Sequence, residues 1–593
     1  MFEFPFWYTL ILLVLMTIFL VKETFDPDIV IFSSLLLLIV GRVITIKEAF
    51  VGFSNSGMLT VGFLFIVAKA LQETGVLNQL GDFFLGNSKK NISVRLLRFL
   101  FPVSAISAFF NNTPVVAMLI PVIHTWARKN DYAVSKFLIP LSYAAILGGT
   151  CTLIGTSTNL VVHGLMIETG IGGMSFFEIS KIGIPVMFIG VFAISIFGHR
   201  FLPDRKEPII ELGDRTREFV IELKVQSDYR YLGSTIEEAG LRHLKGLFLF
   251  QIERNQKIIA PVGHDERIQL DDRLFFTGLP KTIIELQKTP GLTVLKDTKF
   301  DLKNYDSDKL KTFEAVISPA SPLIGYNVRE SNFRGRYNAA ILAIHRSGER
   351  IKRKVGDIVF RAGDTLLILA GHNFLKDWYN SNDFYLVSES ERISSKPRWY
   401  SFLSLSVLFV MILSMALNIV PILASVSIAA VILVMSKCIT RQDARRSIEW
   451  HVLIIIACSF GIAKALDNSG VAYFLANKLI IMVGSFGILG ILVGVYFMTS
   501  LYTEIITNNA AAALLFPISL SAANQAGVDP RPFLIAVAIG ASASFATPLG
   551  YQTNLMVYGP GGYKFKDFMK VGIPMNIFIG FVAVTIIYLF NFA

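Results

Sequence analysis

The sequence predicts a polytopic α-helical membrane protein, built as an inverted repeat, with a polar α+β insert between its two halves. The chain of 593 residues is 53% hydrophobic and only 17% charged, which is too apolar for a soluble protein of this size. The chain has 55 basic and 44 acidic residues, and roughly 60 of all these charged residues lie between Arg205 and Arg398. Two long flanks are therefore almost uncharged. Both flanks carry the same two polar interruptions, in the same order and about 395 residues apart.

Each flank contains five apolar runs long enough to cross a bilayer core of about 30 Å. They lie near 4–21, 29–45, 57–72, 135–165 and 181–201 in the first flank and near 401–418, 420–437, 451–466, 532–557 and 568–592 in the second. Five crossings per copy, an odd number, place the second copy upside down relative to the first. The expected membrane repeats span 1–202 and 399–593.

A further apolar segment lies between the third and fourth runs of each flank, at 95–127 and at 485–524. Each has a polar centre with Pro or Gly nearby. Such a segment is typical of a re-entrant hairpin, in which two half-helices meet at a tip inside the membrane. Each repeat is therefore expected to hold five transmembrane spans and one re-entrant hairpin.

The lysines and arginines of the short loops predict the orientation. An N-terminus outside the cell places most of them, such as Arg128, Lys437 and Arg441, in the cytoplasm. The insert, residues 206–396, is then cytoplasmic, and the two hairpins enter from opposite sides. We therefore expect a multi-pass protein of the cell's inner (plasma) membrane, surrounded by lipid.

The insert is itself duplicated without gaps at a shift of 92 residues. Arg254 pairs with Arg346, and Asp272 pairs with Asp364. Both copies alternate apolar and polar residues, which predicts small strand-rich modules with a helix. The expected modules span 206–298 and 311–388.

These copies resemble the C-terminal module of potassium-conductance regulators, the TrkA-C domain. Segments 321–325 and 361–366 match best, whereas the first copy departs from the pattern, with Asp271 where the second has Gly363. The resemblance implies either a module that only forms dimers or one that senses a small ligand, which the sequence does not identify. Two tandem modules favour a chain that works as a homodimer.

Four polar segments interrupt the flanks at matching positions: the tips Asn111-Asn112-Thr113 and Thr507-Asn508-Asn509, and the breaks Gly155–Leu160 and Gly550–Leu555. Unpaired polar groups are costly in lipid, so they persist where they line a site or a cavity. Free N–H groups at helix N-termini favour an anion, and carbonyls with hydroxyls and amides favour Na⁺. One such triplet alone is more often a helix–helix hydrogen bond, but four at matched positions favour a binding site.

The tips and breaks resemble those of the divalent-anion:sodium symporters, solute carrier family 13, over both membrane flanks. Ser107 and Thr503 each stand four residues before a tip, and each tip is followed by a Gly-x-x-x-Asn break. The resemblance implies substrate contacts at Asn112, Thr113, Asn508 and Asn509. It implies Na⁺ contacts at Ser107, Asn111, Asn112, Gly155, Asn159, Thr503, Thr507, Asn508, Gly550 and Asn554.

The same resemblance implies a Na⁺-coupled secondary carrier of a small divalent oxyanion that works by elevator-type alternating access. Sulfate is favoured, because members with inserted TrkA-C modules resemble the sulfate permeases of algae and bacteria. Asn509 stands where dicarboxylate carriers have a Thr, which weakens a dicarboxylate interpretation. The alternatives are a dicarboxylate- or citrate-type carrier, an H⁺-coupled carrier, a TrkA-C-gated cation channel or antiporter, and a nutrient sensor.

Other functions are disfavoured. The sequence contains no catalytic triad, metal cluster or phosphate loop, so we expect neither an enzyme nor an organic cofactor. The net charge of +11 lies mostly in short loops, so we expect no nucleic acid partner. Glu504, three residues before the second tip, is interpreted as either a proton site or a paired structural group.

Overall fold

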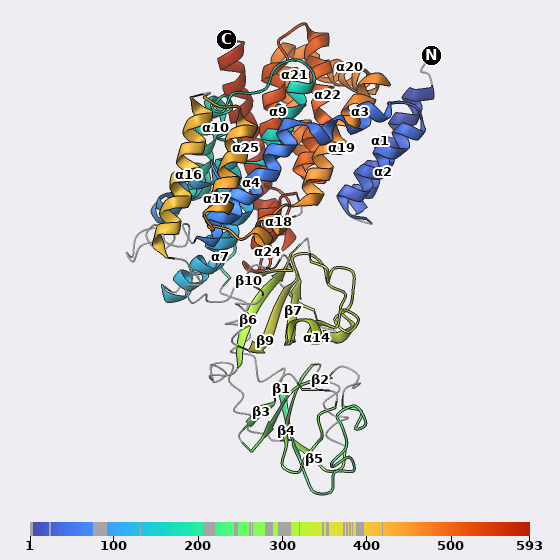
Figure 1. Cartoon of the computed structure of the whole chain (residues 1–593), viewed down its shortest axis with the longest axis vertical. Helices are drawn as coiled ribbons and strands as arrows, with labels where there is room; N and C mark the ends of the chain where they lie inside the picture. The colour runs from blue at the N-terminus through green and yellow to red at the C-terminus, as the bar shows by residue number, and fades with distance from the viewer. Residues whose placement is uncertain are drawn as a thin grey trace.

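The computed structural model shows a large helical body with two β-sheets extending from one end (Figure 1). Both chain termini lie at the opposite end of the helical body, and the sheet of β6–β10 lies between that body and the sheet of β1–β5. The residues described are 4–22, 25–74, 92–130, 132–205, 220–241, 247–255, 257–259, 262–263, 265–278, 289–294, 310–318, 321–346, 349–351, 355–371, 374, 378, 381, 383–386, 397–417, 419–548 and 550–592. The expected domain limits 1, 206, 298, 388 and 593 lie outside them.

The same order of helices occurs in the two flanks. The first contains α1 (Phe4–Lys22), α2 (Pro27–Val40), α3 (Ile46–Phe50), α4 (Ser56–Glu73), α6 (Ile92–Ser107), α7 (Asn112–Lys129), α8 (Leu138–Gly149), α9 (Ser157–Glu168), α10 (Ser180–Ala193) and α11 (His199–Phe201). The second contains α16 (Arg398–Ala416), α17 (Ile422–Met435), α18 (Arg441–Arg446), α19 (Trp450–Asn468), α20 (Val471–Val483), α21 (Gly487–Thr503), α22 (Asn508–Ala526), α23 (Arg531–Ser542), α24 (Gln552–Tyr558) and α25 (Phe565–Asn591).

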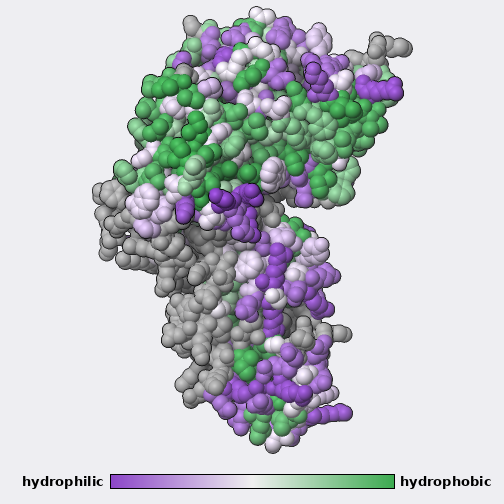
Figure 2. Space-filling model, viewed as in Figure 1, coloured by the Kyte–Doolittle hydropathy of each residue, from purple (hydrophilic) through white to green (hydrophobic). Residues whose placement is uncertain are grey.

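Among the described residues, seven helical segments are long and apolar enough to cross a membrane. The helical body shows an apolar surface, and the sheets a mostly hydrophilic one (Figure 2). Large apolar side chains such as Phe402, Phe409 and Met435 are exposed on the helices, as a surface in contact with lipid requires. The protein is therefore a multi-pass membrane protein.

Four of the apolar runs differ from a simple span. The runs 29–45 and 420–437 form the 14-residue helices α2 and α17, which are shorter than a span. The run 135–165 is divided into α8 and α9 by the non-helical segment 150–156, and the run 532–557 is divided into α23 and α24 by residues 543–551. Each hairpin segment likewise forms two helices, joined by residues 108–111 in the first flank and 504–507 in the second. Each interruption is thus a place where one helix ends and another begins.

The broken helices of one flank pack against the hairpin of the other. Helix α9 contacts α22 and α23, and helix α24 contacts α7 and α8. Helices α4 and α19 pack on the outside of this group, against α9 and α22 respectively. This crossed packing brings all four polar segments to the centre of the helical body.

The insert forms two five-stranded antiparallel sheets with the same strand order. The first contains β1 (Val220–Val225), β2 (Leu247–Arg254), β3 (Lys257–Ile259), β4 (Arg273–Gly278) and β5 (Leu292–Val294), in the order β3-β2-β4-β1-β5. The second contains β6 (Leu310–Ile317), β7 (Ala339–Arg346), β8 (Glu349–Arg350), β9 (Thr365–Gly371) and β10 (Phe384–Leu386), in the order β10-β6-β9-β7-β8, with α14 (Phe333–Tyr337) beside it.

Details of the two sheets also recur at the shift of 92 residues. The register shift after Leu249 in β2 returns after Ile341 in β7. The Arg254–Asp272 ion pair, 2.8 Å, returns as Arg346–Asp364, 2.6 Å. Each pair buries its carboxylate almost completely and satisfies it with a charge-assisted hydrogen bond.

Candidate functional site

The first tip is held by side-chain hydrogen bonds to its own hairpin and to the second flank. Ser107 donates to Asn112 Oδ1 at 2.6 Å, across the end of α6 and the start of α7. Asn112 Nδ2 donates to the Tyr551 hydroxyl at 2.5 Å. Thr113 donates to Gln552 Oε1 at 2.9 Å. Residues 439 positions apart in the sequence are thereby in direct contact.

The second tip repeats this arrangement. Thr503 donates to Asn508 Oδ1 at 3.0 Å, the counterpart of the Ser107–Asn112 bond. Asn509 Oδ1 then accepts from Ser157 at 3.1 Å and from Thr158 at 3.4 Å. Each tip therefore faces the break of the other flank.

The asparagine of each break donates to two backbone carbonyls that precede it in the chain. Asn159 Nδ2 donates to the carbonyls of Gly149 and Thr152 at 3.2 and 2.8 Å. Asn554 Nδ2 does the same to the carbonyls ten and seven residues earlier, at 2.9 and 3.1 Å. Both asparagines are fully buried, and Asn159 Oδ1 has no hydrogen-bond partner among the described residues. Buried polar atoms are rarely left unpaired, so this oxygen is available to a ligand.

The glycines of the breaks permit close backbone packing. A Cβ at Gly155 would lie 2.5 Å from the Gly149 carbonyl oxygen, and one at Gly550 would lie 2.8 Å from the Thr503 carbonyl oxygen. A Cβ at Gly149 would lie 2.6 Å from Asn112 Oδ1. Larger residues would displace these backbone segments from the tips.

Helices α7, α9, α22 and α24 all begin at this centre. Their N-cap residues are Asn111, Thr156, Thr507 and Tyr551, and none of these side chains caps its helix. Asn and Thr are residues that usually cap, and Thr45, Asn55 and Thr440 do so elsewhere in this chain. The first N–H groups of these helices therefore have no acceptor in their own N-cap side chain.

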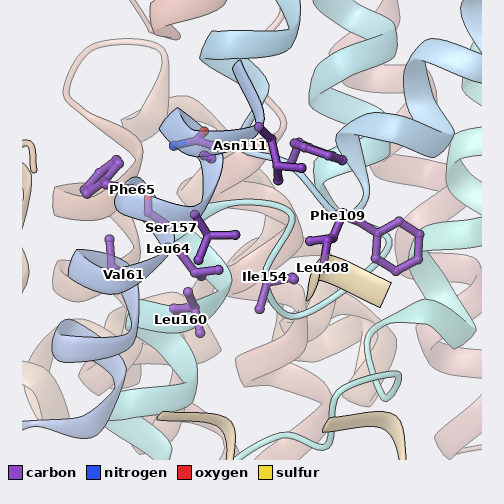
Figure 3. Close-up of a pocket in the computed structure, with 13 residues that line it drawn as sticks. Val61, Leu64, Phe65, Phe109, Asn111, Ile154, Ser157, Leu160 and Leu408 are labelled. Carbon is purple, nitrogen blue, oxygen red and sulfur yellow. The ribbon is translucent and has the colours of Figure 1, made fainter. Parts of the chain in front are cut away.

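Asn111 and Thr507 thus occupy equivalent positions but do not join the central hydrogen bonds. Asn111 lines a largely apolar cavity between α4 and the first tip, with Ser157 as its other polar residue (Figure 3). Thr507 Oγ1 is buried and has no partner among the described residues.

Glu504 is fully engaged by neighbours on the second flank. Its carboxylate accepts from the Ala546 N–H at 2.9 Å, the Thr547 N–H at 2.8 Å and Asn576 Nδ2 at 2.6 Å. These bonds connect the second tip to the segment before the break and to α25. The geometry is that of a paired structural group, the second of the two interpretations open to the sequence.

Three site residues were missed by sequence reasoning: Tyr551, Gln552 and Ser142. Ser142, on α8, donates to Thr553 at 2.9 Å and to Asn554 Oδ1 at 2.7 Å. Tyr551 and Gln552 lie inside the second break, and their position beside Asn554 is the signal that could have identified them. Ser142 carries no such signal, because it lies in an unbroken apolar stretch.

Comparison with known proteins identifies the family. The model of the citrate transporter family matches residues 11–540 and 505–593. The chain belongs to the citrate transporter family. A putative sulfur deprivation response regulator of Chlamydomonas reinhardtii is 35% identical over 582 residues, which is 96% of this chain and 99% of that protein.

Two further relatives are named as transporters. An uncharacterized transporter of Synechocystis is 30% identical and covers 96% of this chain and 95% of its own. Sodium/sulfate cotransporter 1 of Chlamydomonas reinhardtii is 26% identical, with 92% of this chain and 85% of that protein covered. As a member of the citrate transporter family, this protein is therefore a transporter and not an enzyme.

Proposed function

We propose that the protein is a Na⁺-coupled secondary carrier of a small divalent oxyanion, sulfate. The observation that carries this proposal is the meeting of α7, α9 and α22, three helices of 12 to 19 residues, with their N-termini uncapped at one buried point. Helix N-termini attract anions through free N–H groups and the helix dipole. The tip side chains around them are neutral amides and hydroxyls, which bind a dianion without the desolvation cost of a buried cation.

Na⁺ would be held on the other side of each tip. The C-terminal ends of α6 and α21 present carbonyls there, beside the Asn112 and Asn508 side-chain oxygens. The unpaired Asn159 Oδ1 adds a buried oxygen on the first-flank side. Neutral oxygens of this kind suit a monovalent hard cation.

The crossed packing of the two flanks supports an inverted repeat and an alternating-access, elevator-type movement. In that arrangement, the tips and breaks move together relative to α4 and α19. The insert is then cytoplasmic, its modules are TrkA-C-like and bind an unidentified ligand or each other, and the carrier works as a homodimer in the plasma membrane. The relative named as a sodium/sulfate cotransporter supports both the coupling ion and the substrate.

A second candidate is a citrate- or dicarboxylate-type carrier, which the description of the matching family favours. Asn509 argues for the smaller oxyanion. Its Oδ1 already accepts from Ser157 and Thr158, which leaves its amide nitrogen to donate to an oxyanion oxygen. A Thr at this position has a single hydroxyl and fills less of the site.

Uptake of radiolabelled sulfate by proteoliposomes under an imposed Na⁺ gradient tests the proposal. We expect sulfate accumulation that requires the imposed Na⁺ gradient. This accumulation should disappear when choline replaces Na⁺. Uptake driven equally by a proton gradient alone would support an H⁺-coupled carrier. Cation flux without sulfate movement would indicate a channel or antiporter, and no flux of any ion would indicate a sensor.

Competition in the same assay separates the two candidate substrates. Succinate and citrate at the concentration of labelled sulfate are expected to reduce its uptake by less than about half, because the site is built around a small tetrahedral anion. Strong inhibition at equal concentration would favour the carboxylate carrier.

A further inference from the structure

Tyr551 stands where both tips and the first break meet. Its hydroxyl accepts from Asn112 Nδ2 at 2.5 Å and lies 3.3 Å from Thr156 Oγ1. Gly550, the residue before Tyr551, packs against the second tip, because a Cβ there would lie 2.8 Å from the Thr503 carbonyl oxygen. The Tyr551 side chain is 7% exposed, so this buried residue lies between the backbone of the second tip and the amide of the first.

Among the matched residues of the tips and breaks, the largest difference in size is at this position. Tyr551 precedes α24 as its N-cap residue, and Thr156 precedes α9 in the same role. Their backbones are almost the same, with φ and ψ of −138° and 135° for Tyr551 and −143° and 148° for Thr156. The turn itself accepts a threonine, so the backbone does not require an aromatic residue here.

The extra volume of the ring therefore occupies space between the tips. An anion held by Asn112 must lie beside the ring, because the Asn112 amide is bonded to its hydroxyl. A sulfate-sized anion needs no further room, whereas a longer carboxylate would have to extend past the tip amides. A closely packed aromatic ring cannot give way to it.

We propose that Tyr551 is a specificity-determining residue that sets the upper size of the anion accepted by the site. This inference rests on the proposed function as an anion carrier. The ring limits the size of the anion, and the hydroxyl has a separate role. By accepting from Asn112 Nδ2, the hydroxyl keeps Asn112 Oδ1 turned towards Ser107.

Two substitutions separate these roles. Tyr551→Thr installs the residue of the first flank and removes the ring. Tyr551→Phe keeps the ring and removes the hydroxyl. Na⁺-driven uptake of labelled sulfate and of labelled citrate is measured for the wild type and for each full-length variant, together with thermal stabilisation of the detergent-purified protein by each anion.

Tyr551→Thr is expected to raise the ratio of citrate to sulfate, in uptake and in stabilisation, by roughly tenfold or more. Tyr551→Phe is expected to keep the wild-type ratio within about twofold and to raise the KM for sulfate. Tyr496→Phe is the control. Its buried hydroxyl, on α21, has no partner among the described residues, so neither the ratio nor the KM should change.

An unchanged ratio in a correctly inserted Tyr551→Thr protein would overturn the role of Tyr551. So would a Tyr551→Phe protein whose ratio rises as far as that of Tyr551→Thr, because the ring would then not be the determinant. A wild type that moves no sulfate overturns the proposed function instead. Thermal stabilisation by citrate, compared between each variant and the wild type, still decides the role of Tyr551 in that case, because it needs no sulfate transport.

Discussion

The side chains at the tips of the candidate site are neutral amides and hydroxyls. Asn112 and Asn508 are equivalent residues, each accepts from a hydroxyl of its own hairpin, and the Asn112 amide donates to Tyr551. The sequence indicated both as candidates because they recur in matched polar segments of an apolar chain. It missed Tyr551, because an aromatic residue in an apolar run is ordinarily a packing residue and only the folded chain brings its hydroxyl to the tips.

At the residue level, Asn112→Ala and Asn508→Ala are each expected to reduce Na⁺-driven uptake by about tenfold or more. Each removes an oxygen from an ion site and an amide from the anion site, and a hydrogen bond to a charged group contributes about 1.5–3 kcal/mol. Expression and the elution volume of the purified protein should stay unchanged.

Asn130→Ala is the matched control, because the Asn130 side chain bonds only the nearby Trp126 carbonyl at the end of α7 among the described contacts. Its uptake should equal that of the wild type. Retention of uptake within about twofold in either tip variant would remove that asparagine from the site.

The two divided runs show why apolar patterning predicted a single span where the structure has two helices. A hydropathy pattern records that 135–165 is apolar, and it does so whether the chain is one helix or two. The end of α8 depends on contacts made after folding, such as the bonds from Asn159 to the Gly149 and Thr152 carbonyls. These bonds satisfy backbone groups that would otherwise be costly in a membrane interior, and no local pattern encodes them.

Glu504→Gln tests the element that supports the second break. A carboxylate accepts at both oxygens, but Gln has a single acceptor oxygen and turns its NH₂ group towards one of the donors at Ala546 or Thr547. We expect the variant to be destabilised by about 1–3 kcal/mol, measured as a lower midpoint of thermal unfolding in detergent. The pH dependence of its remaining uptake should match that of the wild type.

Glu48→Gln provides the comparison, because Glu48 also accepts from a backbone N–H, that of Thr45, but at an exposed position where water can replace the lost bond. Its unfolding midpoint should change little. A Glu504→Gln protein of normal stability whose uptake no longer depends on pH would identify Glu504 as a proton site.

At the scale of the whole molecule, the duplicated insert contacts the duplicated helical body. The second sheet touches the helical body directly below the second break: a Cβ at Gly363 would lie 2.8 Å from Leu555 Cδ1, and one at Gly559 would lie 3.2 Å from the Gly363 carbonyl oxygen. Val316 on β6 is buried in the same apolar cluster as the helices. The periodicity of the sequence predicted the duplicated insert, but nothing in it could place Gly363 next to Asn554.

This contact gives the insert a physical route to the site, because Leu555 follows Asn554 directly on α24. A ligand or partner of the insert can alter transport only if its affinity differs between the states of the carrier. Replacement of residues 206–396 by a flexible linker should leave a protein that inserts and carries substrate, since all four polar segments lie outside them, but that no longer responds to cytosolic factors. Loss of all uptake in an inserted, linker-bearing protein would make the insert part of the transport machinery.

A single substitution tests the contact itself. Gly363 has φ of +80°, and Asp271, its counterpart in the first sheet, has φ of +66°, so this turn accepts an aspartate. Gly363→Asp is therefore expected to fold, to press against Leu555 and to change the uptake rate by roughly twofold or more. Gly325→Asp is the control, because Gly325 has φ of +85° in a turn between β6 and α14 and its Cβ would face open space. Equal rates in the two variants would show that the insert does not act on the site through this contact.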